Sequence, residues 1–307
     1  MVRWLAKSAI QNAISRLPDP ERTNHFFQRR VSRRIPISDQ HLLKKVEWAV
    51  DHLRAARAHL DRAPSAIRAF EFGAGWDLVA PLTYWMAGID RQLLIDIAPH
   101  VRLELTNHSI ARLAELGPQV AERLGRPVRA VDPAPLTSLA GLSQRLGIEY
   151  RAPVAAHATG LPAGSFDLVT TSDTLEHVPA EALPAILAEC RRLLADGGVM
   201  THLIDMMDHY RYVDDSITVY NFLKYSDRAW RRLNSPIEPQ NRLRLPDYRE
   251  LFRMSGLEIV DEDVRAAGEA DLAWLRRADI APRFREYSID DLGARSVRLT
   301  AIPASTS

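Results

Sequence analysis

Short apolar runs alternate with amphipathic stretches over most of the chain. Five such runs occur between residues 67 and 204, with the sequences IRAFEF, RQLLIDI, IEYRAPVA, FDLVTTS and GGVMTHLI. Each is short and apolar enough to be a buried strand, and helical patterns such as 99–116 and 180–194 separate them. Strands that alternate with helices predict a parallel sheet covered on both faces, which is a doubly wound α/β fold.

Helical patterns precede this region. In the first, apolar residues recur at helical spacing until Pro18 and Pro20 end it, and they are Val2, Leu5, Ala6, Ala9, Ile10, Ala13 and Leu17. A second helix is predicted from an N-cap at Ser38 to about Arg62. Its apolar face holds Leu42, Val46, Ala49, Leu53 and Ala56. We therefore predict a helical extension over residues 1–65 that serves as a lid or a docking element.

Two segments interrupt the alternation of strands and helices. Residues 117–147 add mostly helical material before the third strand, and residues 206–245 are polar and rich in aromatic side chains. A helix (DYRELFRMSG), a strand (LEIVDED), a polar helical stretch around Trp274 and a last strand (ARSVRLTAI) follow. The predicted parts are thus an extension at 1–65, an α/β core at 66–205 with a helical insertion at 117–147, a second insertion at 206–245 on the substrate side, and a C-terminal part at 246–307 that completes the sheet.

Composition and charge change this picture little. The 307 residues carry a formal net charge of +1, which does not suggest a nucleic-acid partner. The charge is uneven, because 14 basic and 6 acidic residues lie at or before Arg68. The single cysteine, Cys190, excludes an internal disulfide and shares an apolar helix face, so we predict that it belongs to the core.

A glycine turn follows the first strand in the sequence EFGAGWD. Gly73 and Gly75 would let a ligand approach the backbone, and the helix after them offers unpaired N–H groups. Asp96 ends the second strand about 20 residues later, where a carboxylate can accept both hydroxyls of a ribose. The pattern favours a ligand that contains a nucleoside.

Four motifs in this order resemble the class I S-adenosylmethionine-dependent methyltransferases: EFGAGWD, LLIDI, LPAGSFDLVTTSDTLEHVP and RRLLADGGVMTHLID. The resemblance implies a Rossmann-like seven-stranded sheet, S-adenosylmethionine as the cofactor, and methyl transfer. The segments DMMDHYRYVDDSITVYNFLKYSDRAW and QNRLRLPDYRELF resemble bacterial methyltransferases often found beside surface-polysaccharide genes. That second resemblance implies a sugar hydroxyl, in a surface glycan or its precursor, as the acceptor. The alternatives are a small-molecule hydroxyl or amine, and a non-catalytic subunit of a membrane-associated assembly.

The resemblance also assigns cofactor contacts. Glu71 would hold the amino group, Asp96 the ribose hydroxyls, and Ile97 would pack on the adenine. In chain order the implied contacts are Glu71, Phe72, Gly73, Ala74, Gly75, Asp96, Ile97, Ala156, His157, Ala158, Ser172 and Asp173. Trp76 stands where many relatives have a third glycine, and it either packs against the following helix or walls the methionine pocket. The segment 153–160 lacks the acidic residue that usually meets the adenine amino group, and His157 is the candidate substitute.

Two clusters of acidic residues and histidines could act on the acceptor. One is Asp173-Thr-Leu-Glu176-His177, and the other holds His202, Asp205, Asp208 and His209. Asp208 and His209 begin a polar loop, so exposure to solvent is the alternative for these two. Removing a proton from a hydroxyl calls for a base such as histidine. We predict that Glu176, His177 and Asp205 face the acceptor, with His209 as an alternative base and His202 as a core residue. The first cluster also resembles some metal-assisted O-methyltransferases of quinone biosynthesis, which adds a divalent metal as an alternative.

The N-terminal residues leave the question of further partners open. Arg29, Arg30, Arg33 and Arg34 form either a solvated face or a site for phosphate or an anionic glycan. The apolar stripe over 2–17 has three interpretations: a packing helix or lid, an interfacial membrane helix, or a partner-binding helix. No secretion signal or spanning stretch is evident. We expect a cytoplasmic protein, with peripheral membrane contact through residues 1–34 as an alternative and no nucleic-acid partner.

Overall fold

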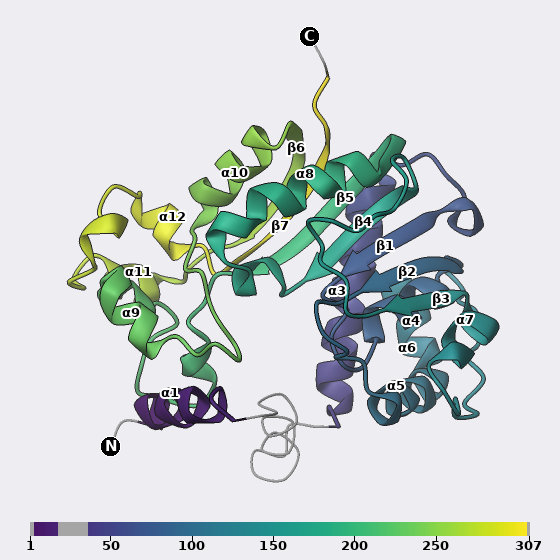
Figure 1. Ribbon diagram of the computed structural model, residues 1–307, viewed down its shortest axis with the longest axis horizontal. Helices are drawn as coiled ribbons and strands as arrows, with labels where there is room; N and C mark the ends of the chain where they lie inside the picture. The colour runs from purple at the N-terminus through teal and green to yellow at the C-terminus, as the bar shows by residue number, and fades with distance from the viewer. Residues whose placement is uncertain (1–2, 18–35, 306–307) are drawn as a thin grey trace.

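A computed structural model describes residues 3–17 and 36–305, and its centre is a seven-stranded sheet (Figure 1). The strand order is β3-β2-β1-β4-β5-β7-β6. The strands are β1 (Arg68–Phe72), β2 (Arg91–Ile95), β3 (Ile148–Arg151), β4 (Phe166–Ser172), β5 (Leu194–Asp205), β6 (Leu257–Arg265) and β7 (Ser296–Pro303). The first five are parallel, and β7 runs antiparallel to both β5 and β6. The predicted doubly wound, seven-stranded fold is confirmed.

Helices cover both faces of the sheet. On one face lie α3 (Asp39–Arg57), α4 (Val79–Met86), α5 (Leu103–Glu115), α6 (Gly117–Leu124) and α7 (Ala140–Leu146), which share a core with β2 and β3. On the other lie α8 (Leu183–Leu193) and α10 (Leu245–Met254), which pack on β4, β5 and β7. The insertion predicted at 117–147 contains α6 and α7 with a non-helical stretch between them.

Helix α3 packs directly on the sheet, against β4, β5 and α4. It begins at the predicted N-cap, where the hydroxyl of Ser38 accepts from the backbone N–H of His41 at 3.3 Å. It ends at Arg57 rather than near Arg62, because the chain turns there to bury Leu60 in the core. Buried His52, which the apolar pattern did not single out, joins the helix to β4 and β5 through two hydroxyl groups.

The insertion at 206–245 builds a second, smaller core. It contains η4 (His209–Tyr212), η5 (Asn221–Lys224) and α9 (Asp227–Leu233), which pack with α11 (Glu269–Leu275) and α12 (Ile289–Gly293). Large aromatic side chains fill this core, namely Tyr210, Tyr220, Phe222, Trp230 and Phe284. Helix α1 (Arg3–Ile14) lies beside α9 at the edge of the molecule (Figure 1).

The face of α1 that packs differs from the predicted one. The buried residues are Trp4, Ser8, Gln11 and Ile14, whereas the predicted apolar stripe at Leu5, Ala9, Ile10, Ala13 and Leu17 faces solvent. The Trp4 ring explains the reversal, because its centroid lies 5.4 Å from that of Tyr210 and 5.8 Å from that of Tyr225. The arginine group at 29–34 lies outside the described residues. Within the described ranges, no helix has the length and apolarity needed to span a membrane.

Candidate functional site

The glycine turn after β1 lies at the carboxyl edge of the sheet. Gly73 and Gly75 have φ angles of +71° and +73°, which residues with a side chain rarely adopt. A Cβ on Gly73 would lie 2.5 Å from Cγ2 of Thr174, whereas a Cβ on Gly75 would meet nothing within 4 Å. The N–H of Gly73 donates to the carbonyl of Ile95 at 3.0 Å, which holds the turn against the end of β2. Space for a ligand is therefore left beside Gly75.

The two predicted cofactor carboxylates, Glu71 and Asp96, are buried at the ends of adjacent strands. Glu71 accepts a hydrogen bond from the Thr170 hydroxyl at 2.9 Å, and burial raises its pKa to about 8. Asp96 accepts one from the Tyr150 hydroxyl at 3.1 Å, a partner that the sequence patterns did not single out. Carboxylates in such surroundings favour a ligand that brings positive charge or hydroxyl donors. Phe72, by contrast, has its side chain in the core, so only its backbone reaches this edge.

The residues predicted to line the adenine lie toward the surface beyond β2 and β3. The side chain of Ile97 is 77% exposed, His157 and Ala158 are exposed, and Ala156 is half-buried. Apolar Ile97 thus offers a surface that an aromatic ring could cover.

A cavity of about 430 Å³ opens beside the glycine turn. Gly75 and Trp76 line it from the turn, Lys45 from α3, Asp173 from the end of β4, and Glu238 from the insertion. Of the two interpretations of Trp76, this position favours a wall of the pocket. Asp173 has a left-handed φ of +49°, which turns the chain from β4 into the site.

Ser172 is directed differently from its neighbour Asp173. Its hydroxyl lies 3.1 Å from Nε2 of His52 on α3, so its hydrogen bond joins the strand to that helix. Lys45 of the same helix forms an ion pair with Asp77 after the glycine turn, at 2.7 Å. Helix α3 is therefore fastened both to the end of β4 and to the turn.

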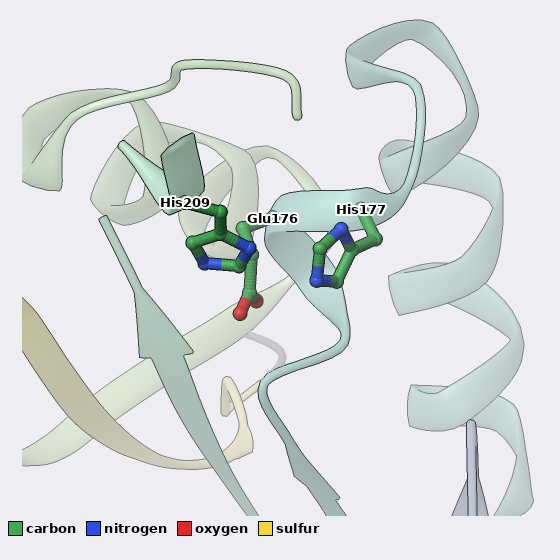
Figure 2. Close-up of side chains that lie close together, drawn as sticks. All are labelled: Glu176, His177 and His209. Carbon is green, nitrogen blue, oxygen red and sulfur yellow. The ribbon is translucent and has the colours of Figure 1, made fainter. Parts of the chain in front are cut away.

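The two predicted clusters of acidic residues and histidines meet at the same edge (Figure 2). Glu176 and His177 lie in η2 (Leu175–His177) after β4, and His209 begins η4 after β5. One ligand atom from each of the three lies within 4.8 Å of the other two, and the histidine ring centroids are 5.0 Å apart. The clusters meet because β4 and β5 are neighbouring parallel strands.

Negative charge is concentrated in this cluster. Both carboxylate oxygens of Glu176 are buried without a hydrogen-bond partner among the described residues. Burial, together with the charges of Asp173 and Asp205, raises the pKa of Glu176 well above its usual range. Burial and the Asp205 charge also raise the pKa of Asp173 to about 7. Such a group of carboxylates would be stabilised by protons or by a cation.

The two histidines differ in protonation. Nδ1 of His177 lies 2.7 Å from the carbonyl oxygen of Pro239 and must donate to it, which leaves Nε2 unprotonated in the neutral ring. Burial lowers the pKa of His177 and favours this neutral form. For His209 the effect of burial is outweighed by Asp205, whose Oδ2 lies 3.3 Å from Nε2, and the pKa is raised. His177 is therefore the better proton acceptor.

Asp205 holds the insertion to the end of β5. It accepts a hydrogen bond from the N–H of Met207 at 2.8 Å and one from the hydroxyl of Tyr212 at 2.7 Å. Burial would raise its pKa, but His209 and these donors outweigh that effect and lower it. Asp205 thus remains ionised beside His209. Tyr212 was not predicted, because nothing in the sequence pattern separates it from the other aromatic residues of the insertion.

Three further predictions can be compared with the structure. His202 is a buried core residue whose Nδ1 lies 2.8 Å from the Thr171 hydroxyl, as predicted, and burial lowers its pKa to about 3. Cys190 is also buried, as predicted. Exposure to solvent was an open alternative for Asp208 and is wrong, because Asp208 is buried and its side chain accepts from the N–H of Tyr210 at 2.9 Å.

The site includes one residue from the insertion that the sequence did not reveal, Glu238. Its carboxylate accepts hydrogen bonds from Lys7 at 3.1 Å and Gln11 at 3.0 Å, both on α1. Burial would raise the pKa of Glu238, but Lys7 and Gln11 outweigh burial and lower it to about 2. An ionised Glu238 therefore links α1 to the cavity, and only the folded insertion brings these three residues together.

Known proteins resemble this chain in part. A methyltransferase domain family matches residues 115–201. A ubiquinone biosynthesis O-methyltransferase of Xanthomonas oryzae pv. oryzae is 40% identical over 80 residues, which cover 25% of this chain and 33% of that protein. One from Nitrosococcus oceani is 35% identical over 119 residues, which cover 34% of this chain and 49% of that protein. The chain thus spans about a third of the length of the first of these relatives.

A solved structure shares the fold over nearly the whole chain. The PH0226 protein from Pyrococcus horikoshii OT3 is 12% identical, with a TM-score of 0.52 over 90% of this chain and 98% of that protein. At this identity the likeness concerns the arrangement of strands and helices. The domain match, in turn, includes β4 and η2 but ends before Asp205 and His209.

Proposed function

We propose that the chain is a class I S-adenosylmethionine-dependent methyltransferase and that it methylates a hydroxyl oxygen; its fold and its match to a methyltransferase domain family support this proposal. One observation carries the proposal: Glu71, the glycine turn and Asp96 meet at one edge of the sheet, and the cavity beside the turn is lined by Asp173 and Glu238, whose charges act on the Glu176–His177–His209 cluster. The cofactor and the acceptor would then occupy neighbouring parts of the same edge.

The cofactor residues fit their proposed roles. Glu71 would bind the amino group, since a neighbouring positive charge favours the ionised form of its buried carboxyl group. Asp96 would accept the ribose hydroxyls, with Tyr150 orienting its carboxylate. Gly75 leaves the open space that the methionine part needs. When bound, the cofactor supplies a methyl group on a positively charged sulfur, which leaves as a neutral thioether.

On the acceptor side, His177 would act as the base. Pro239 fixes the ring so that unprotonated Nε2 points away from the carbonyl, and a lowered pKa keeps the ring neutral. Asp205 and Tyr212 would hold His209 in place. Base catalysis of this kind contributes typically about 10²- to 10⁴-fold. Alignment of the nucleophile and exclusion of water by the buried walls would supply much of the remainder.

A divalent cation would fit the same cluster. The orphaned oxygens of Glu176, together with His177 and His209, form a mixed oxygen and nitrogen ligand set of the kind that transition metals accept. A cation bound there would lower the pKa of an acceptor hydroxyl. Glu176 would hold the cation, and Asp205 would orient His209 toward it.

Two classes of acceptor are supported by different observations. The matched relatives bear the name of O-methyltransferases of ubiquinone biosynthesis, which supports a small molecule with a hydroxyl group. The resemblance of the 206–245 segment supports a sugar hydroxyl in a surface glycan or its precursor. We place the small-molecule hydroxyl first, because Glu176 is buried and both histidines are half-buried, which suits a compact oxygen nucleophile.

Calorimetry with S-adenosylhomocysteine tests the proposed cofactor site. The full chain should bind it, and Asp96→Ala should weaken binding by at least about 100-fold, since two hydrogen bonds to a charged group contribute roughly 3 kcal/mol or more together. Asp263→Ala, an exposed carboxylate on β6, is the matched control and should leave the affinity unchanged. If Asp96→Ala and the wild type bind S-adenosylhomocysteine with equal affinity, then Asp96 does not hold the ribose and the proposed cofactor site is wrong.

Transfer of a labelled methyl group tests the proposed acceptor and the proposed role of His177. Candidate acceptors are hydroxylated aromatic metabolites and extracted glycans, each offered with and without added Mg²⁺. Label should appear on one class and fall strongly in His177→Ala. Cofactor binding without transfer to any acceptor would instead support a non-catalytic subunit.

A further inference from the structure

Helix α1 presents an apolar face that the described part of the structure does not cover. Leu5, Ile10 and Leu17 are 39%, 50% and 46% exposed, and Ala9 and Ala13 are exposed between them. On α1 (Arg3–Ile14), Leu5, Ala9, Ile10 and Ala13 follow helical spacing and form one stripe, and Leu17 lies three residues beyond the end of the helix. An isolated exposed leucine is ordinary, whereas a stripe along a whole helix is not.

The opposite face of α1 fixes its orientation. Trp4 packs between Tyr210 and Tyr225, and its backbone N–H donates to Asp214 at 3.1 Å. The Ser8 hydroxyl donates to the carbonyl of Leu233 at 2.6 Å. Turning the helix to bury its stripe would break all of these contacts, so the stripe is held outward.

The size of the stripe argues against a second protein chain. A helix of 12 residues is about 18 Å long and about 10 Å wide, which gives a footprint of roughly 180 Å². A stable protein partner usually needs about 800 Å² from each side. A lipid surface requires no such minimum, because a short helix can lie in it with one face immersed.

The charges around the stripe fit an anionic lipid surface. Residues 1–18 contain no aspartate or glutamate, and Arg3 and Arg16 are exposed. Lys7 is occupied by Glu238, so the exposed cations here are Arg3 at the start of α1 and Arg16 two residues after its end. The long stem of Arg16 can lie along the apolar stripe while its guanidinium reaches lipid phosphates.

We propose that the apolar face of α1, with Leu5 and Ile10 on the helix and Leu17 just after it, binds the surface of an anionic phospholipid bilayer and holds the enzyme there as a peripheral protein. Helix α1 would lie in the plane of the surface, with its apolar face among the upper acyl chains and with Arg3 and Arg16 at the phosphates. A lipid-borne or membrane-dissolved acceptor would then be within reach of the cavity beside Glu238.

Co-sedimentation of the full chain with vesicles tests the proposal. One set of vesicles contains phosphatidylcholine alone, and the other contains equal parts of phosphatidylcholine and phosphatidylglycerol. The wild type should pellet with the anionic vesicles, and Leu5→Glu/Ile10→Glu should reduce binding by about tenfold or more. Arg3→Gln/Arg16→Gln should reduce binding to the anionic vesicles and weaken its dependence on salt.

Matched controls separate this result from misfolding and from self-association. Met254→Glu changes an apolar side chain that is 67% exposed on α10 and should bind vesicles like the wild type. Unchanged circular dichroism and melting temperature would show that the α1 variants fold. A wild type that stays in the supernatant would overturn the proposal. So would a Leu5→Glu/Ile10→Glu variant that pellets fully, or a dimer in light scattering that this variant dissociates.

Discussion

Arg244 should be among the most important single residues for the stability of the acceptor side. It is fully buried immediately before α10, and its guanidinium donates to three backbone carbonyls. These belong to Met206 (2.6 Å), Leu292 (2.6 Å) and Ala294 (2.5 Å), so one side chain joins the end of β5 to the segment that leads into β7. Arg244→Met preserves much of the volume and removes every donor.

The cost follows from the three carbonyls. A buried acceptor that loses its donor costs about 1–3 kcal/mol, so losing the donors of all three carbonyls costs roughly 3–9 kcal/mol of unfolding free energy before any offset. Removal of a buried charge offsets part of this cost, since burial already lowers the pKa of Arg244 to about 10. We therefore expect a loss of about 3 kcal/mol and, for a chain of 307 residues, a fall in melting temperature of roughly 5 °C.

Urea unfolding followed by circular dichroism measures this loss. The matched control is Arg249→Met on α10, where the side chain is 46% exposed and paired with Glu262. That change should cost less than about 1 kcal/mol. If Arg244→Met and Arg249→Met lose equal stability, then water or neighbouring groups satisfy the three carbonyls and the reasoning is wrong.

Three other predictions concern the turn, the sheet and the cluster. Gly73→Ala should lower the affinity for S-adenosylhomocysteine by about tenfold or more in calorimetry, because its Cβ would clash with Thr174; an affinity equal to that of the wild type would show that the turn adapts. The pKa of Asp167 is lowered, because the hydrogen bonds and charge of Arg68 outweigh the effect of burial. The contribution of Asp167 to stability is therefore present above about pH 4, the pKa of the unfolded chain, and is lost as the pH falls through the lower pKa of the folded protein. The melting temperatures of wild type and Asp167→Asn, measured against pH, should therefore converge below about pH 4, and a constant gap would contradict this. Glu176→Gln should abolish any rise in melting temperature caused by Mn²⁺ in the wild type, and an undiminished rise would place the cation elsewhere.

The sheet could be predicted from the sequence because each of its strands is a short, local run of apolar residues. Every run of the IRAFEF type became a strand, with shifts only at the ends. The sequence also predicted that Glu71 and Asp96 lie at the ends of neighbouring strands, since the ends of parallel strands fix where such residues lie. A buried strand can be recognised from its own apolar composition, without information from the rest of the chain.

The contacts that depend on packing could not be predicted in this way. The exposed stripe of α1 is more apolar than the buried face, so the pattern alone pointed to the wrong side, and only the slot between Tyr210 and Tyr225 explains why Trp4 faces inward. Glu238 was missed for a similar reason, because its partners lie more than 200 residues away on α1. Neither contact leaves a periodic signal in the sequence.

Three consecutive residues of the insertion, 238–240, each contact a different part of the molecule. Glu238 receives α1, the carbonyl of Pro239 fixes His177, and the side chain of Gln240 accepts from the backbone N–H of His209 at 3.0 Å. This short segment lies far outside the 115–201 match, and the glycine turn and Asp96 lie far from it in sequence. If the proposed roles hold, acceptor preference can evolve by changes in this one insertion while the residues proposed to hold the methyl donor stay as they are.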